Sequence, residues 1–337
     1  MRSRPFTRPP LSVLAGATAL ALALTACGGD DAEAGVDDSA GETRVFSADN
    51  GEVEIPADPQ RIVATGYAVP SLIEADAELV GISSWERGTN LMSEDDLATY
   101  ESLTKVAGET ADSTNYEAIA EAEPDLIIIG VPAPALVDID LERLESIAPV
   151  AAIGPTLPSG WRDLSRRHLD AAGELDAWEE ARDAYEARAA ELSEKYADLL
   201  GSASFGHLGA YGDTSAGSFM REYAGSWGPN IAEDIGASYP GEVAKKTGGA
   251  GDVSEYPSIE ELPESFGDVD VITYSLEDDG KPSAAVKYVL DSPLWKTLPA
   301  VKADRAIGVR FTEASTYGTA LRTLDELDAV LAPLLAG

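Results

Sequence analysis

The side chains best suited to recognise a small molecule in this sequence are aromatic residues and arginines that follow short apolar runs. They are Tyr67, Trp85, Arg87, Tyr211, Phe219, Arg221, Trp227, Tyr274, Arg310, Phe311 and Tyr317. Aromatic rings cover the apolar surface of a bulky organic ligand, and guanidinium groups bond its oxygen atoms, often in pairs. We therefore expect these residues to line a binding cleft. The alternative for each ring is an ordinary place in the core or on the surface.

The sequence offers little for covalent chemistry. The chain has two histidines and one cysteine, and it contains no G-x-S-x-G, H-E-x-x-H or C-x-x-C motif. We expect His168 to be solvated or to cap its helix, and His207 to be a buried, hydrogen-bonded residue of a strand. A hydrolase with a carboxylate pair among Glu255, Glu260 and Glu264 is a distant alternative. We predict a protein that is not an enzyme and holds no cofactor or directly bound metal.

The elements that must position the candidate residues alternate between strand and helix, which is typical of α/β units with parallel sheets. Binding residues in such sheets lie just beyond the carboxyl ends of the strands, where most of the candidates fall. We predict strands at 61–65, 79–83, 126–130, 150–153, 205–211, 271–275 and 306–311, and helices at 70–75, 117–123, 141–147, 161–172 and 323–335.

A long helical segment separates the two sets of strands. Gly173 is expected to end the helix over 161–172. The following segment, Asp176–Leu200, has apolar residues spaced by threes and fours. A helix of this length spans about 37 Å, which is enough to bridge two lobes. The sequence therefore predicts an N-terminal α/β lobe at 44–175, a bridging helix at 176–200 and a C-terminal α/β lobe at 201–337.

The first 43 residues have a different character. Residues 1–26 begin with three arginines and continue with an apolar run at 11–24, which is too short to span a membrane and is typical of an export signal. The sequence Leu24-Thr25-Ala26-Cys27 resembles the lipobox of bacterial lipoproteins, and Cys27 is the only cysteine in the chain. The acidic segment that follows is predicted to be a disordered tether over 27–43. We expect an extracytoplasmic protein anchored to the cell membrane by lipid on Cys27.

The overall charge excludes some partners. With 60 acidic and 24 basic residues among 337, the formal net charge is −36. Binding to nucleic acid requires a basic face, so nucleic acid is a poor candidate partner. At 44% hydrophobic residues, the body is nevertheless ordinary globular protein, and we expect a monomer.

Several segments, in order, resemble one protein family over nearly the whole mature chain. These are Pro59-Gln60-Arg61-Ile62-Val63-Ala64, Glu78-Leu79-Val80-Gly81-Ile82, the segment from Asn115-Tyr116-Glu117-Ala118-Ile119 to Pro124-Asp125-Leu126-Ile127-Ile128, and Ser292-Pro293-Leu294-Trp295-Lys296-Thr297-Leu298-Pro299. They are similar to the periplasmic binding proteins that serve ABC importers of iron–siderophore complexes, haem and cobalamin.

The resemblance implies two Rossmann-like lobes with central sheets, joined by a single long rigid α-helix, with the ligand held in the cleft between them. It implies capture of a ferric siderophore and delivery to a membrane permease, with ATP hydrolysis left to partner subunits. The acidity of the chain favours a hydroxamate over a trianionic catecholate. Cobalamin and haem remain alternatives, as does a structural or adhesive surface lipoprotein.

Two glutamates match positions at which this family docks onto its permease. Glu117 lies in the segment Asn115-Tyr116-Glu117, and Glu260 lies in Ser258-Ile259-Glu260. The resemblance implies that each pairs with an arginine of the permease. The alternative is that both are acidic residues favoured by the dipole at the start of a helix.

Overall fold

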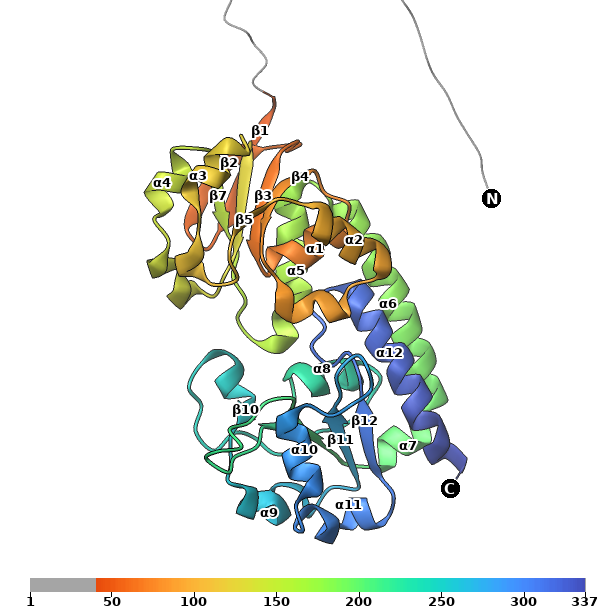
Figure 1. Cartoon of the computed structure of the whole chain (residues 1–337). Helices are drawn as coiled ribbons and strands as arrows, with labels where there is room; N and C mark the ends of the chain where they lie inside the picture. The colour runs from red at the N-terminus through yellow and green to blue at the C-terminus, as the bar shows by residue number, and fades with distance from the viewer. Residues whose placement is uncertain (1–40, 337) are drawn as a thin grey trace, which may run out of the picture. The chain divides into compact units, whose positions relative to one another are not determined.

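A computed structural model describes residues 41–336, which form two α/β lobes beside a pair of long helices (Figure 1). The predicted signal at 1–26, the lipidation site Cys27 and nearly all of the tether at 27–43 lie outside these described residues. Within 41–336, no helix combines the length and the apolar character needed to cross a membrane.

The N-terminal lobe contains a five-stranded parallel sheet in the order β5-β4-β3-β6-β7. Every residue of β3 and β6 is buried, as expected for central strands covered on both faces. A hairpin of β1 (Thr43–Ala48) and β2 (Gly51–Pro56) precedes the sheet. The strands of the sheet are β3 (Ile62–Gly66), β4 (Leu79–Ser83), β5 (Lys105–Ala107), β6 (Leu126–Gly130) and β7 (Val150–Ala152), and the helices are α1 (Ala68–Glu74), α2 (Glu94–Ser102), α3 (Tyr116–Glu121), α4 (Leu141–Glu145) and α5 (Trp161–Ala172).

The C-terminal lobe contains a second five-stranded sheet in the order β10-β9-β8-β11-β12. Three of its strands are parallel, whereas β9 runs antiparallel to its neighbours β8 and β10, so this sheet is mixed. The strands are β8 (Phe205–Leu208), β9 (Arg221–Glu222), β10 (Ser254–Glu255), β11 (Val271–Ser275) and β12 (Ala306–Val309), and the helices are α7 (Ala197–Ser202), α8 (Trp227–Asp234), α9 (Leu262–Phe266), α10 (Ala284–Asp291), α11 (Pro299–Lys302) and α12 (Tyr317–Leu331).

The predicted fold class is confirmed, and most element boundaries differ from prediction by a few residues. Strands β4, β6 and β11 begin and end where predicted, and Gly173 ends α5 in the left-handed conformation at φ 85°. Helix α12 begins at Tyr317 rather than 323, because the Thr316 hydroxyl accepts a hydrogen bond from the Thr319 amide and caps the helix earlier.

The long helix α6 spans Leu175–Lys195, so it is shorter than the predicted 176–200. It ends at Tyr196, which is completely buried and donates a hydrogen bond of 2.8 Å to the Asp328 carbonyl of α12. Figure 1 shows α12 beside α6 along one edge of both lobes. The buried face of α6, which includes Tyr185 and Leu192, belongs to the same hydrophobic cluster as Leu324 of α12. The link between the lobes is therefore a pair of packed helices.

Further polar contacts cross between the lobes. Arg322 of α12 donates to the carbonyl oxygens of Leu91 (2.6 Å) and Met92 (2.9 Å) in the N-terminal lobe. The amide of Gly318 donates to Glu74 of α1 at 2.8 Å. These bonds add to the packed helices and restrain movement of one lobe against the other.

Candidate functional site

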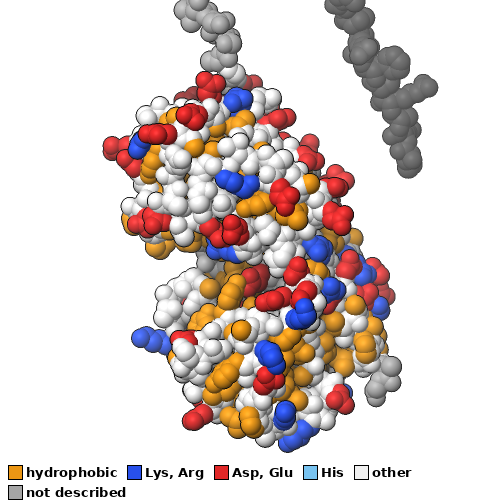
Figure 2. Space-filling view, in the orientation of Figure 1, with side chains coloured by type: hydrophobic (Ala, Val, Ile, Leu, Met, Phe, Trp, Pro, Cys, Tyr) orange, Lys and Arg blue, Asp and Glu red, His pale blue; other side chains and the backbone are white. Residues whose placement is uncertain are grey.

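Three adjoining cavities occupy the cleft between the lobes, and Figure 2 shows the surface hollowed there. Their volumes are about 490, 230 and 360 Å³, and Arg87 borders all three. We call the first the main cavity. It is formed by the segment after β4 together with the segments after β8, β11 and β12. The cleft therefore lies at the carboxyl ends of strands from both sheets, as expected for α/β proteins.

The N-terminal side of the cleft is an aromatic pair with an arginine stacked on it. Tyr67 and Trp85 meet edge to face, with ring centroids 4.8 Å apart. The Arg87 guanidinium lies 4.2 Å from the Trp85 ring and 5.2 Å from the Tyr67 ring, and it pairs with Glu109 at 3.2 Å. Stacking holds the arginine in a fixed orientation at the cavity edge.

Tight backbone packing at the strand ends positions this pair. The amide of Tyr67 donates to the Gly130 carbonyl at 2.8 Å, which joins the end of β3 to the end of β6. Gly66 precedes it at φ 59°, and any side chain there would collide with the Gly130 carbonyl. The turn that presents Tyr67 therefore depends on glycine.

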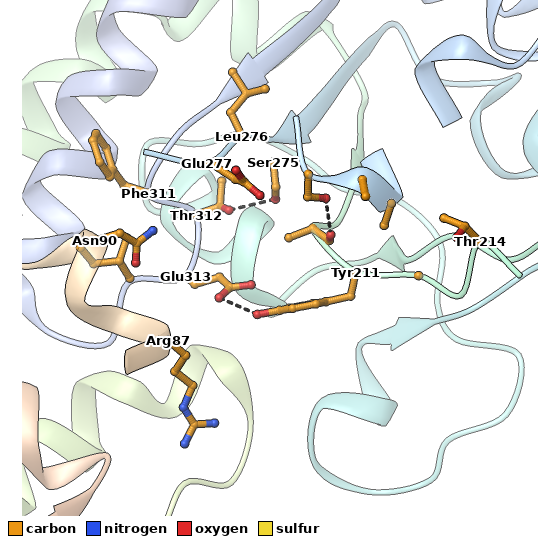
Figure 3. Close-up of a pocket in the computed structure, with 16 residues that line it drawn as sticks. Arg87, Asn90, Tyr211, Thr214, Ser275, Leu276, Glu277, Phe311, Thr312 and Glu313 are labelled. Atoms are coloured by element: carbon orange, nitrogen blue, oxygen red, sulfur yellow. Dashed lines mark hydrogen bonds between the residues drawn. The ribbon is translucent and has the colours of Figure 1, made fainter. Parts of the chain in front are cut away.

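The C-terminal side is more polar. Tyr211 donates a hydrogen bond of 2.9 Å to Glu313, and Figure 3 shows both side chains above Arg87. Trp227 and Phe311 also line the cavities. Phe311 adopts φ 61°, an uncommon conformation for a residue with a side chain, and Thr323 donates to its carbonyl at 2.6 Å. Backbone strain is thus held at a residue of the cavity surface.

Burial shapes the charges of the cleft. It raises the pKa of the Glu313 carboxyl, while the hydrogen bond from Tyr211 acts in the opposite direction. Burial also raises the pKa of Tyr67 and of Tyr211, so both phenols are neutral hydrogen-bonding groups at physiological pH. The structure therefore presents one stacked arginine, neutral phenols and carboxyl groups to a ligand.

Five of the predicted contacts are not brought to these cavities, which corrects the expectation of a single shared cleft. Phe219 is 1% exposed and packs on Phe266 in the core of the C-terminal lobe, and Tyr274 packs edge to face on Trp295 there. Tyr317 packs against Trp161 in the interface between the lobes. In these three cases the ring fills apolar space.

The other two are arginines whose charged groups are engaged elsewhere. Arg221 is 2% exposed and donates to the carbonyl oxygens of His207 (3.2 Å) and Glu222 (3.0 Å). Arg310 pairs with Glu326 of α12 at 2.6 Å. The structure therefore brings together Tyr67, Trp85, Arg87, Tyr211, Trp227 and Phe311 from the predicted set.

Both histidines are completely buried. His207 has hydrogen-bond partners at both ring nitrogens, Thr273 at 2.8 Å and Ser275 at 3.1 Å, as predicted. The expectation that His168 is solvated or caps its helix is wrong, because Ser71 and the Ile153 carbonyl hold its ring in the core of the N-terminal lobe. Burial lowers the pKa of His168 to about 4 and that of His207 to about 3, so both are neutral at physiological pH.

The two predicted docking residues are exposed, one on each lobe. Glu117 lies in the first turn of α3, and Glu260 lies in the 3-10 turn Ile259–Glu261. Asn115 and Ser258 cap these two turns. Both positions are accessible to a partner, and both remain compatible with a purely helix-stabilising role.

Most of the polar residues of the main cavity are not among the contacts predicted from the sequence. Ser275 ends β11, so the strand-end rule could have identified it, whereas Glu313 gave no local signal. The missed polar residues of the main cavity are Asn90, Thr214, Ser275, Glu277, Ser283, Thr312 and Glu313.

Comparisons with known proteins agree on one family. The family described as "Periplasmic binding protein" matches residues 62–311. The "Iron(3+)-hydroxamate-binding protein YxeB" of Bacillus subtilis is 27% identical over 85% of this chain and 84% of its own length. The "Probable siderophore-binding lipoprotein YfiY" of the same organism is 26% identical over 91% of this chain and 93% of its own length.

A solved structure gives the same result. The siderophore periplasmic binding protein from the fuscachelin gene cluster of Thermobifida fusca is 30% identical and superimposes with a TM-score of 0.68. The match covers 83% of this chain and 98% of that one.

Proposed function

Because the chain belongs to the periplasmic binding protein family, we propose that it captures a ferric siderophore in the cleft between its lobes and delivers it to an ABC importer. Members of this family are substrate-binding proteins. The observation that carries the proposal is the cleft itself, in which Tyr67, Trp85 and Arg87 face Tyr211 and Trp227 across adjoining cavities. The rings suit the apolar organic shell of the chelate, and Arg87 suits the oxygen atoms around its iron.

A hydroxamate is the siderophore class we favour. Three catecholates give a ferric complex with three negative charges, whereas three hydroxamates give a neutral ferric core. Carboxyl groups on both sides of the cleft, including Glu109 and Glu313, repel a triply negative catecholate complex and tolerate a neutral hydroxamate complex. The relatives named for iron(3+)-hydroxamate binding support the same choice.

Tryptophan fluorescence tests ligand binding directly. Trp85 and Trp227 border the cleft, whereas Trp295 lies in the hydrophobic core of the C-terminal lobe. We expect a ferric hydroxamate to quench the emission of the protein. Replacing Trp85 or Trp227 with Phe should reduce the quenching, and Trp295→Phe is the matched control. A response to cobalamin or haem, with none to any ferric siderophore, would contradict the proposal.

We also propose that the protein is a lipid-anchored monomer that needs no cofactor. The periplasmic binding protein family and the relative named as a lipoprotein support an extracytoplasmic location. The anchor would be two or three acyl chains on Cys27 after removal of residues 1–26, which suffices for stable membrane attachment. Cys27→Ser should release the protein into the soluble fraction. Retention of the variant in the membrane would contradict a lipid anchor.

Docking onto the permease is a separate proposal. Exposed carboxylates on different lobes set the orientation of a partner and speed its encounter. We expect Glu117→Arg combined with Glu260→Arg to abolish siderophore uptake by cells while the affinity for the ligand stays unchanged. Glu121→Arg, on the same helix as Glu117, is the control. Loss of ligand binding in the double variant would contradict the docking role.

A further inference from the structure

The cleft has an unequal balance of charge. Among the described residues that line its three cavities, Arg87 is the one basic side chain, and Glu109 already pairs with it at 3.2 Å. The acidic side chains lining the same cavities are Glu109, Asp112, Asp138, Glu277 and Glu313. Glu277 and Glu313 belong to the main cavity, on the side of the C-terminal lobe.

A buried chain of hydrogen-bonded side chains lies behind this surface. His207 Nδ1 lies 2.8 Å from the Thr273 hydroxyl, and Nε2 lies 3.1 Å from the Ser275 hydroxyl. In the neutral ring one nitrogen donates and the other accepts, and the Thr273 hydroxyl has further partners at 3.3 Å in the Gly206 carbonyl and the Tyr239 hydroxyl.

The chain continues to the cavity surface. The Ser275 hydroxyl also forms a hydrogen bond of 2.9 Å with the Thr312 hydroxyl (Figure 3). Ser283 donates inward, to the Ala210 carbonyl at 2.8 Å, and Tyr211 donates to Glu313. Ser275, Ser283 and Thr312 all line the main cavity. Each hydroxyl oxygen carries two lone pairs, so all three can accept a hydrogen bond from a ligand.

The charge and the hydroxyl groups favour the same kind of ligand group. A surface that combines hydroxyl oxygens with two carboxyl groups is complementary to a group that is positively charged and rich in N–H donors. A ferric trihydroxamate core is itself neutral and supplies no such donors, so the complementary group must lie on its organic arm.

Resting on the proposed function, we propose that the C-terminal-lobe side of the main cavity is a subsite for an ammonium group on the organic arm of the ferric chelate. Glu277 and Glu313 supply the negative charge. The Thr312 hydroxyl, which follows β12 and is hydrogen-bonded to Ser275 of β11, supplies a hydrogen-bond acceptor at the cavity surface. Arg87, stacked on the opposite side, contacts the oxygen-rich iron centre.

A matched pair of ligands tests the subsite. The probes are a linear ferric trihydroxamate that ends in a primary amine and the same complex with that amine acetylated, which removes the charge and leaves the iron centre intact. We expect the amine form to bind about tenfold or more tightly, as for a charge-assisted hydrogen bond. Glu277→Gln and Glu313→Gln should each reduce this preference several-fold.

Asp278→Asn is the matched control, because Asp278 is exposed, adjoins Glu277 and does not line the main cavity. It should keep the preference of the unaltered protein. Equal and tight binding of both probes would overturn the subsite and leave the proposed function intact. Failure of both probes and of every other ferric siderophore would instead overturn the proposed function. A preference that survives in both glutamate variants would also overturn the subsite.

Discussion

Replacing Arg162 with Ala should destabilise the protein by loosening the contact between its lobes. Arg162 lies on α5 of the N-terminal lobe and forms an ion pair with Asp234 on α8 of the C-terminal lobe. Its guanidinium also donates to Asn230 Oδ1 at 3.2 Å and to the Ser159 carbonyl at 3.1 Å, and it stacks 4.4 Å from the Trp161 ring.

The magnitude follows from the burial of the pair. Breaking a fully buried ion pair costs about 3–5 kcal/mol, and an exposed pair is worth about 0–1 kcal/mol. The Arg162 and Asp234 side chains are 26% and 33% exposed, and Asp234 also accepts a hydrogen bond of 2.5 Å from Tyr185, so loss of Arg162 does not leave its carboxyl without a partner. We therefore expect a loss of about 2–3 kcal/mol in the free energy of unfolding. For a chain of this size, with an unfolding entropy of about 2.1 cal/mol/K per residue, that lowers Tm by about 3–5 °C.

Circular dichroism during thermal unfolding is the assay, and Arg166→Ala is the control. Arg166 lies on the same helix and pairs with Asp163, but these side chains are 41% and 67% exposed. Its loss should change the free energy of unfolding by no more than about 0.5 kcal/mol. Equal shifts in Tm for the two variants would refute the argument that the contact between the lobes, rather than the arginine itself, carries the stability.

Three further predictions concern buried groups near the cleft. Burial raises the pKa of Glu222 to about 8 from 4.5, so the folded protein holds a proton there that the unfolded chain loses. The free energy of unfolding of the wild type should therefore fall relative to that of Glu222→Gln as the pH rises from about 4.5 to 8, by up to about 1.4 kcal/mol per pH unit. Chemical denaturation at several pH values measures this difference. Parallel pH profiles for the two proteins would exclude a buried, protonated Glu222. Gly228→Ala should lower the free energy of unfolding by about 1–3 kcal/mol, because the new methyl group collides with the His207 ring. A variant with the same Tm as the wild type would contradict this. Gly66→Ala should cost at least as much, because it combines a collision with φ 59°, whereas Gly201→Ala on α7 meets nothing within 4 Å and should be neutral or stabilising in the same thermal melts.

Local sequence patterns were sufficient for the fold class and for the central parallel strands of both lobes. A continuous apolar run such as Leu126–Gly130 can be buried on both faces only in a central strand, and Gly173 ends a helix wherever it lies in the fold. The strand-end rule located Tyr67, Trp85 and Arg87 for the same reason, since a residue just after a parallel strand lies at the ligand-binding edge of its sheet. These features depend on neighbours in the chain, which the sequence displays.

The remaining features of the site depend on partners that are distant in the chain. Arg310 and Arg87 both follow strands, yet Glu326 on α12 neutralises the first while aromatic stacking holds the second at the cavity. Phe219 and Phe311 were both predicted to line the cleft, but the Phe219 ring packs on Phe266 in the core. Burial and pairing of these groups are decided by elements that meet only on folding.

The sequence by itself determined two α/β lobes, a long connecting helix and an aromatic edge on the first sheet, because hydrophobic periodicity and turn residues act over a few positions. Only the tertiary structure decided the chemistry of the opposite side. Tyr211 meets Glu313 across 102 residues, and the hydrogen-bonded chain from His207 to Thr312 joins strands β8 and β11 to the segment after β12. Folding brings these partners together, and no property of a single segment encodes them.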